Sequence, residues 1–492
     1  MKKKIDFFSV FIFFITILGS IFHSLRGIPN DTFYTIKIGE FISKHGIDLK
    51  DHYCIIDNLS YSYPHWLYDL IIYKVYNFSG FFGLYVFNII LYVFLVLLIY
   101  NILKYFTKNR FISFLVSYFC CRNLGFFMVS RAQEITIILF VLILFSIYKL
   151  VIENKKKYAI VTFFISVLIA NLHCAVWPFI FVLFLPFFSE YFVLKLIDKF
   201  KDKIKIDNKI IEDKFILKKE INLKYLIVAF VGCVFSGVLT PIKLAPYTYL
   251  VKTMMGNSQS YILEHKAIEL VNCPFQLSFL LLILLLLIFK TKFKFREAFM
   301  IGGLFYLSMS AERHMIFLAT IGLIYIALIF NRFIVNNGSG TLNFVESKIN
   351  KIYILCPILL LFLGYVIYDY NYNGQKFIPK SSYPVDAVKW MNINLNKNDI
   401  VLYNDYDIGS YLLFNDYKVF VDSRADLYTK EFNKNIYILD DSYNMEYDYL
   451  EEKYKFTHFV VHTNSKKYKM LLLDSRFNEL YSDKFFSVFS VN

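Results

Sequence analysis

Charged residues are scarce in this chain, because Asp, Glu, Lys and Arg together make up only 19% of its 492 residues. Hydrophobic residues account for 57% and aromatic residues for 20%, and the mean hydropathy is +0.48. An ordinary soluble domain of this length does not have such a composition, since its surface needs more charge. The sequence therefore predicts a polytopic membrane protein.

The chain also lacks the signatures of several common protein classes. It contains no G-x-x-x-x-G-K-[ST] or G-x-G-x-x-G motif, so nucleotide hydrolysis is not supported, and it shows no internal repeat of fixed period. Its seven cysteines have no paired metal-ligand spacing and lie mostly in apolar segments, which argues against a zinc site or a disulfide framework. The basic start is followed by an apolar run without an A-x-A cleavage site, which predicts an uncleaved first span.

Apolar segments predict about eleven transmembrane helices, although several are shorter than the roughly 20 residues that a hydrocarbon core requires. With the N-terminus in the cytoplasm, every connection expected on that side is basic, as the positive-inside rule demands. The predicted spans are residues 5–25, 81–103, 111–129, 135–152, 158–170, 176–194, 225–239, 275–289, 298–310, 315–330 and 352–368. The predicted cytoplasmic connections are residues 104–110, 153–157, 195–224, 290–296 and 331–351.

The net charge of +14 does not point to nucleic acid. Residues 371–492 carry 15 basic and 17 acidic side chains, so the positive excess lies wholly in residues 1–370. Charge placed in this way belongs to membrane topology. We therefore expect membrane lipid as a partner, and no nucleic acid.

The connections expected on the outer side carry a different set of polar residues. Any one of these residues, taken alone, is explained as a helix cap or as a side chain that extends to the membrane surface. Taken together they predict an outward-facing polar cavity, because ionisable groups at membrane depth are costly unless they are paired or face water. They are Asp31, His45, His52, His65 and Asp69, then Arg131, Gln133 and Glu134, then Asn171 and His173, then Glu264, His265 and Glu269, and finally Glu312, Arg313 and His314.

The pattern changes after residue 370. Short apolar segments alternate between strand-like and helix-like periods, which predicts a small α/β domain. We expect helices at residues 385–394, 409–414 and 466–473, and strands at residues 400–403, 418–421, 457–462 and 485–491. With an odd number of spans, this domain at residues 371–492 lies outside the cell. The predicted fold is thus an all-α polytopic membrane domain at residues 1–370, with a large first external loop at residues 27–80, plus an extracytoplasmic α/β domain.

The motifs of this chain resemble those of bacterial polytopic proteins in the GT-C glycosyltransferase superfamily, which use sugars carried on a polyprenyl phosphate. There an acid follows the first span, commonly with two aromatics and a histidine, then Gly-Glu and His-Gly. Here Asp31 is that acid, and Thr35 replaces the histidine. The other matching segments are Gly39-Glu40, His45-Gly46, His65-Trp66-Leu67 with Asp69, Arg131-Ala132-Gln133, Asn171-Leu172-His173, Glu264, Glu312-Arg313-His314 and Asp422-Ser423-Arg424. Ala132 and Cys174 replace a proline and a glycine of the family motifs.

The resemblance implies hexosyl or pentosyl transfer, with inversion, from a polyprenyl-phosphate sugar donor to an extracytoplasmic glycan, lipid or protein. Asp31 would accept the proton of the attacking hydroxyl. Arg131 and Arg313 would neutralise the departing phosphate, with His65, His173 and His314 as further donors. Gln133, Glu134 and Glu264 complete the implied substrate-binding set.

Several alternatives remain open at this stage. Asp31 follows Pro29 and Asn30 in a pattern typical of a helix N-terminus, so it could serve only to cap that helix. A divalent cation could bind between Asp31 and Glu134, Glu264 or Glu312, although the sequence does not require one. The chain could instead be a transporter or flippase of a lipid-linked glycan, or an inactive relative that serves in assembly. A transporter would be expected to place ionisable residues near the membrane midplane, whereas here they gather at one face.

Overall fold

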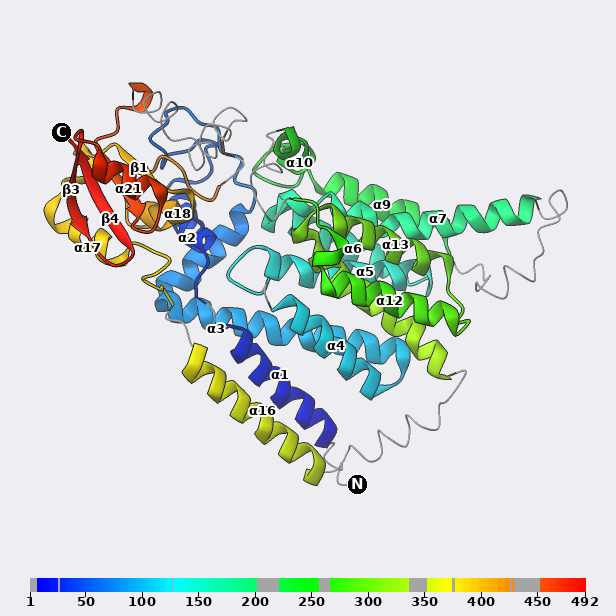
Figure 1. Cartoon of the computed structure of the whole chain (residues 1–492). Coiled ribbons are helices and arrows are strands. Elements are labelled where there is room, and N and C mark those ends of the chain that lie inside the picture. The colour runs from blue at the N-terminus through cyan, green and yellow to red at the C-terminus, as the bar shows by residue number, and fades with distance from the viewer. Residues whose placement is uncertain are drawn as a thin grey trace. The chain divides into compact units, whose positions relative to one another are not determined.

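The computed structural model divides into two compact units, whose elements are labelled in Figure 1. Unit 1 comprises Met1–Leu25, Val86–Thr240 and Leu263–Asn373, and unit 2 comprises Arg26–Tyr85, Pro241–Ile262 and Gly374–Asn492. The residues that the structure describes are 7–24, 27–125, 127–200, 221–255, 266–335, 352–373, 377–424, 427–428 and 452–492. Residues of the first predicted loop thus belong to the same unit as the C-terminal residues.

Unit 1 is built from helices, and each predicted span corresponds to a helix at that place. Two of them begin with side-chain caps that satisfy a backbone N–H: Asn109 accepts from Ile112 N at 2.9 Å and Asn222 from Tyr225 N at 3.3 Å. The helices are α1 (Phe7–Ser24), the later part of α3 (Trp66–Thr107), α4 (Arg110–Leu124), α5 (Gln133–Val151), α6 (Lys157–Leu172), α7 (Phe179–Phe200), α9 (Leu223–Ser236), α12 (Pro274–Ile288), α13 (Phe295–Ser310), α14 (Met315–Phe317) and α16 (Ile352–Asn373). Short turns are η1 (Cys174–Val176), η3 (Leu270–Asn272), η4 (Glu312–His314) and the π-helical η5 (Leu318–Gly322).

Among the described residues, four helical stretches are long and apolar enough to cross a membrane. These are Trp66–Thr107, Gln133–Val151, Cys174–Phe200 and Glu312–Val335, and five further apolar helices are shorter. The chain is therefore a helical membrane protein, and the count of eleven spans stays a prediction.

Buried hydrogen bonds supplement apolar packing between the helices of unit 1. The Trp177 indole N–H, just before α7, donates to Ser166 Oγ on α6 at 3.1 Å and to Ser236 Oγ on α9 at 3.2 Å. Asn171, at the end of α6, donates to Leu239 O at 2.9 Å. These contacts tie α6, α7 and α9 together at the end of α6 where the polar residues occur.

Unit 2 combines helices with a four-stranded sheet of strand order β1-β2-β4-β3. The β1–β2 pair is parallel, with Tyr403 opposite Phe459, and the other two pairs are antiparallel. Its elements are α2 (Asn30–His45), the start of α3, α10 (Ala245–Met255), α17 (Val385–Asn394), η6 (Lys397–Asp399), β1 (Leu402–Asn404), α18 (Tyr406–Phe414), β2 (His458–His462), α21 (Lys466–Leu473), β3 (Phe477–Ser482) and β4 (Phe486–Val491).

Two strand predictions need correction. Residues 418–421 form no strand of the sheet; instead Val419 makes an isolated bridge with Cys54, and its N–H donates to Tyr53 O at 2.9 Å. Strand β3 was missed because its sequence, Phe-Asn-Glu-Leu-Tyr-Ser, is mostly exposed and lacks an apolar face. The helices at residues 385–394 and 466–473 are confirmed.

The first predicted loop is largely helical. It contains α2 and the first part of α3, whose axis breaks at Ser79 and Gly80. Gly80 adopts φ 60° and ψ −153°, a region that side chains rarely occupy, so the glycine permits the break. The break falls where the sequence predicts the second span to begin.

Candidate functional site

Asp31 lies in the first turn of α2 and is half-buried. The N-cap residue of this helix is Pro29, which makes no side-chain capping hydrogen bond. Asp31 therefore does not occupy the capping position, although a carboxylate in a first turn is favourable to the helix dipole. The capping interpretation of Asp31 is wrong in this respect, because the helix begins at Asn30, two residues earlier than an N-cap at Asp31 would require.

His65 is oriented by two neighbours in unit 2. Its Nδ1 lies 2.6 Å from Asp69 Oδ1, and its Nε2 lies 3.1 Å from the Tyr34 hydroxyl. Asp69 is fully buried, and the side chain of His65 is 13% exposed. A buried carboxylate on Nδ1 fixes the orientation of the imidazole, which leaves Nε2 to act toward the Tyr34 hydroxyl.

Helices α2 and α3 approach closely at Gly39. A Cβ atom added to Gly39 would lie 2.1 Å from Asp69 O and 2.6 Å from Tyr73 Cβ. The following residue, Glu40, binds Lys37 at 2.7 Å and Lys44 at 2.6 Å. The Gly-Glu motif therefore has a structural explanation, since its glycine allows α2 to contact α3 at Asp69, the residue that hydrogen-bonds to His65.

In unit 1, Arg131, Gln133 and Glu134 form the entry to α5. Glu134 N donates to Arg131 O at 3.1 Å, and the Glu134 side chain is fully buried. Gln133 is partly buried, and its Oε1 has no hydrogen-bond partner within the described part of the chain. A buried acid and an amide oxygen at a helix start make a polar site among apolar helices.

His173, which follows α6, lies against this helix entry. Its Nδ1 is 3.1 Å from Thr136 Oγ1, and Thr136 donates to Ala132 O at 2.6 Å. The structure therefore brings His173 next to the segment that contains Arg131, Gln133 and Glu134. This segment lies some 40 positions earlier in the sequence.

Arg313 and His314 lie in η4 and join the same end of unit 1. His314 Nδ1 is 3.2 Å from Ser310 Oγ, and its ring lies 5.1 Å from that of Phe179 at the start of α7. Phe317 connects both regions, because its ring is 5.4 Å from Phe179 and 5.0 Å from Phe140 on α5. Six of the predicted residues thus belong to one end of unit 1: Arg131, Gln133, Glu134, His173, Arg313 and His314.

The remaining predicted residues fall elsewhere. Asp31 and His65 belong to unit 2, and each set is described within its own unit. Glu264 lies outside the described residues.

Arg424 pairs with Asp422 of its own motif, with Nη2 to Oδ2 at 2.6 Å, and it also binds Asp51, a partner that the sequence did not indicate. All three side chains are buried. Burial acts to lower the pKa of Arg424, but the charges of Asp422 and Asp51 outweigh it and raise the pKa. No local signal could have linked Asp51 to a residue 373 positions away.

One group of side chains in the described part of unit 2 has the spacing of metal ligands. Atoms of Asp405, Asp407 and His462 lie within 4.8 Å of one another. Lys467 binds Asp405 at 2.8 Å, and His462 binds Asp407 at 2.9 Å. Because these groups already compensate one another, the cluster is explained as an ion-pair network at the start of α18. Just before it, at the end of β1, the Asn404 side-chain amide donates to Val421 O at 2.7 Å.

Solved structures with a similar fold exist. The Archaeoglobus fulgidus oligosaccharyltransferase in the apo form matches 100% of this chain and 75% of its own, with a TM-score of 0.62 and 12% identity. The same enzyme tethered through a disulfide bond to an acceptor peptide with the NVT sequon matches with a TM-score of 0.56, covering 100% and 74% of the two chains. No family model and no curated protein matches the sequence.

The chain shares the fold of this oligosaccharyltransferase. The resemblance inferred from the sequence is confirmed at this level, and it extends over the whole chain. At 12% identity the likeness concerns the fold, and the chemistry has to be argued from the residues.

Proposed function

We propose that this protein is an inverting GT-C glycosyltransferase that moves a sugar from a polyprenyl-phosphate-linked donor to an extracytoplasmic acceptor. The observation that carries the proposal is its similarity along its full length to an oligosaccharyltransferase, with a TM-score of 0.62. The polar residues found at one end of unit 1 support it, because a transferase that acts on a lipid-borne sugar needs polar groups at a membrane surface.

Asp31 is the proposed general base. It would accept the proton of the acceptor hydroxyl while that oxygen bonds to the anomeric carbon and the bond to the donor phosphate breaks. The leaving group is a phosphate anion, so this displacement needs no proton donor. Asp31 lies in the first turn of α2, two positions after the N-cap residue, and is half-buried.

Arg131 and Arg313 are proposed to bind the departing phosphate, since the guanidinium fork suits bidentate phosphate contacts. His173 and His314 lie in the same part of unit 1 and would donate further hydrogen bonds. Gln133 and Glu134 would contact the sugar hydroxyls. His65, oriented by Asp69, is proposed as a further substrate-binding residue.

The acceptor is the open part of the proposal. The similar oligosaccharyltransferase structure holds an acceptor peptide, which favours a protein, whereas a wall polymer or a lipid-linked glycan would suit the same chemistry. The C-terminal residues of this chain are proposed to lie on the acceptor's side of the membrane.

The test uses the full chain in proteoliposomes that contain polyprenyl-phosphate donors with radiolabelled hexoses or pentoses, together with membranes of the source cell as acceptor. We expect transfer of label, and Asp31→Asn should lower it by about 10²- to 10⁴-fold while the protein stays folded in the membrane. Asp57→Asn is the matched control, because Asp57 is an exposed acid of the same loop region. Full activity of Asp31→Asn would refute the assignment.

A chelator added to the same assay tests whether a divalent cation takes part. If a cation held by Asp31 and a second acid such as Glu134 or Glu312 is needed, chelation stops transfer and added Mg²⁺ or Mn²⁺ restores it. Unchanged transfer would leave Asp31 acting as a base alone.

A further inference from the structure

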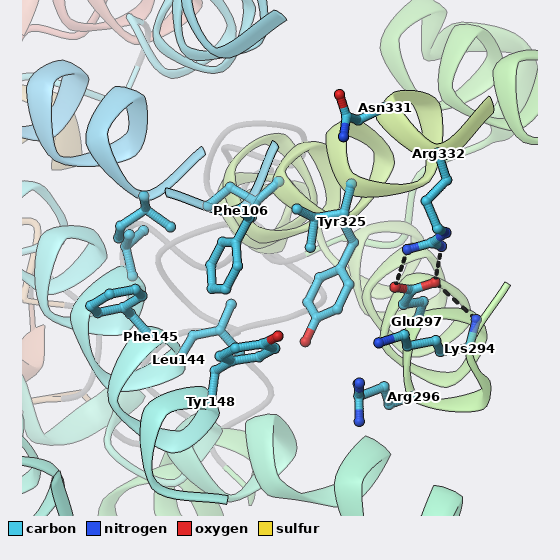
Figure 2. A pocket seen from close by; sticks show the side chains of 14 residues that line it. Phe106, Leu144, Phe145, Tyr148, Lys294, Arg296, Glu297, Tyr325, Asn331 and Arg332 are labelled. Carbon is cyan, nitrogen blue, oxygen red and sulfur yellow. Dashed lines mark hydrogen bonds and ion pairs between the residues drawn. The ribbon is translucent and has the colours of Figure 1, made fainter. Parts of the chain in front are cut away.

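A cavity of about 190 Å³ lies within unit 1, apart from the residues proposed for glycosyl transfer (Figure 2). It is formed where several helices end or begin: Phe106 is near the end of α3, Tyr148 is in the last turn of α5, and Lys294 and Arg296 flank the start of α13. Arg332 lies near the end of the apolar stretch Glu312–Val335. Three candidate membrane spans therefore end at this cavity.

One side of the cavity is cationic. Lys294, Arg296 and Arg332 line it, together with a single lining acid, Glu297. Arg332 donates to both oxygens of Glu297, and the backbone N–H of Lys294 donates to Glu297 Oε2 at 2.9 Å (Figure 2). Arg296 donates to the buried Glu190 at 2.8 Å. Three cations against two carboxylates leave a net positive charge.

The ion pair with Glu297 and a hydrogen bond from Nη2 to Lys292 O at 3.3 Å hold the Arg332 guanidinium in place without using every donor. The Arg332 side chain is 25% exposed, and its Nε has no hydrogen-bond partner among the residues that the structure describes. A guanidinium has five N–H donors, so one bound to a carboxylate still offers others to an anion. Such a group is already oriented before the ligand arrives, which lowers the entropy lost on binding.

The other side of the cavity is apolar and aromatic. Phe106 and Phe145 lie opposite the charged residues, with Tyr148 and Tyr325 between the two sides (Figure 2). Phe106, Phe145 and Leu328 are only partly buried, so this wall is accessible along the helices. An occupant with one anionic end and one hydrocarbon end matches both walls.

The position of the cavity identifies the source of such an occupant. The cationic residues belong to the connections at residues 290–296 and 331–351, which the sequence predicts on the cytoplasmic side. Helix ends of candidate spans lie at the level of lipid headgroups, and basic pockets between such helices bind anionic lipid headgroups. A volume of about 190 Å³ accommodates a phosphate headgroup, and the acyl chains would extend along the apolar wall.

We propose that this cavity binds the phosphate headgroup of an anionic phospholipid from the leaflet that adjoins this end of the helices. The site is independent of glycosyl transfer, since its residues are separate from those assigned to the donor phosphate. Lys294, Arg296 and Arg332 receive the phosphodiester, and the half-buried aromatic side chains contact the start of the acyl chains.

The test measures lipid binding to the purified full chain by native mass spectrometry and by the shift of its unfolding temperature. The probes are phosphatidylglycerol, phosphatidylcholine and inorganic phosphate. We expect phosphatidylglycerol to bind and to stabilise the protein, and Lys294→Gln to weaken this binding about five-fold, as one lost cation at a membrane surface implies. Lys292→Gln is the matched control, because Lys292 is an exposed lysine of the same connection that does not line the cavity.

Arg332→Lys provides a second variant that keeps the charge opposite Glu297 and removes the planar fork. It should also weaken phosphatidylglycerol binding, because a lysine cannot offer paired donors to a phosphate. Equal binding of phosphatidylcholine, or equal weakening by Lys292→Gln, would overturn the proposal. Inorganic phosphate that competes with the lipid at similar concentration would overturn the lipid assignment in favour of a free anion.

Discussion

Units 1 and 2 are held together by different kinds of contact. In unit 1, apolar helices pack on one another, and ionisable groups pair between helices, as Arg296 does with Glu190 and Arg332 with Glu297. In unit 2, short elements from the two ends of the chain depend on one another. Ile28 N donates to Phe377 O at 2.9 Å, and the Tyr383 hydroxyl donates to Ile28 O at 2.7 Å.

Aromatic and ionic contacts continue this dependence in unit 2. The Phe33 ring lies 5.0 Å from that of Tyr383 and 5.1 Å from that of Tyr411, both in edge contact. Lys37 binds Asp416 at 2.7 Å, and Arg424 joins Asp51 to Asp422. Unit 1 follows from local hydrophobicity, whereas unit 2 requires specific pairs of residues that are distant in sequence.

This difference predicts its largest effect at Arg424. Arg424→Met leaves Asp51 and Asp422 buried without their shared cation, which should lower the stability of unit 2 by about 3–5 kcal/mol. Hydrogen exchange followed by mass spectrometry would show the loss in peptides of α2, α18 and the sheet. Peptides of α5 and α6 should keep their protection.

Arg476→Met is the matched control for that substitution. Arg476 binds Asp474 with Nε to Oδ2 at 3.0 Å and Nη2 to Oδ2 at 2.6 Å, a geometry close to that of Arg424 with Asp422. Its side chain is 49% exposed, so the change should cost at most about 1 kcal/mol. Equal losses in the two variants would show that burial of the Arg424 cluster does not determine the stability of unit 2.

A smaller effect is expected at the contact of α2 with α3. Gly39→Ala places a Cβ atom 2.1 Å from Asp69 O, and the backbone cannot move aside as a flexible side chain would. The strain should destabilise unit 2 by about 1–3 kcal/mol. Displacement of Asp69 should also disturb its contact with His65, so substrate binding should weaken together with stability in the transfer assay.

Gly302→Ala in α13 of unit 1 is the comparison. An added Cβ there meets nothing within 4 Å, and alanine favours a helix over glycine by up to about 1 kcal/mol. Thermal unfolding should therefore show Gly302→Ala to be neutral or stabilising. If Gly39→Ala were equally harmless, the close approach of α2 and α3 would not be needed by unit 2.

The difference between local hydrophobicity in unit 1 and distant residue pairs in unit 2 explains how much of the fold could be predicted. Long apolar runs indicated the helices of unit 1, and the periodicity of apolar residues alone predicted the bounds of α17 and α21. Hydrophobicity could not show that Val419 pairs with Cys54 instead of entering the sheet, because that pairing depends on residues 365 positions apart. The exposed face of β3 likewise gave no strand signal.

For the candidate site, the sequence indicated the residue types and the helix ends but not their contacts. His173 and Thr136 are neighbours only because α5 and α6 pack side by side. The orientation of His65 by Asp69 is a local i,i+4 pair at the start of α3, and the spacing of the two residues could have predicted it. The link of His314 to Phe179 required the packing of helices distant in sequence.

The smallest expected effect is a pH dependence of unit 2 through His462. Burial acts to lower the pKa of His462, but its hydrogen bond to Asp407 and the charges of Asp407 and Asp405 outweigh burial and raise the pKa above its ordinary value of 6.5. A pKa raised in the folded state means that the pair stabilises unit 2 fully below about pH 6.5 and loses this contribution as pH rises through the folded pKa. Asp407 is 62% exposed, so the pair contributes less than about 1 kcal/mol to the stability of unit 2.

The stability difference between the unchanged chain and Asp407→Asn, measured by hydrogen exchange of β2 and α18 across this pH range, should shrink as pH rises. A difference that grows with pH would mean that the pair does not link α18 to β2 as an ion pair, and that the long-range contacts of unit 2 are carried by its aromatic and backbone pairs instead.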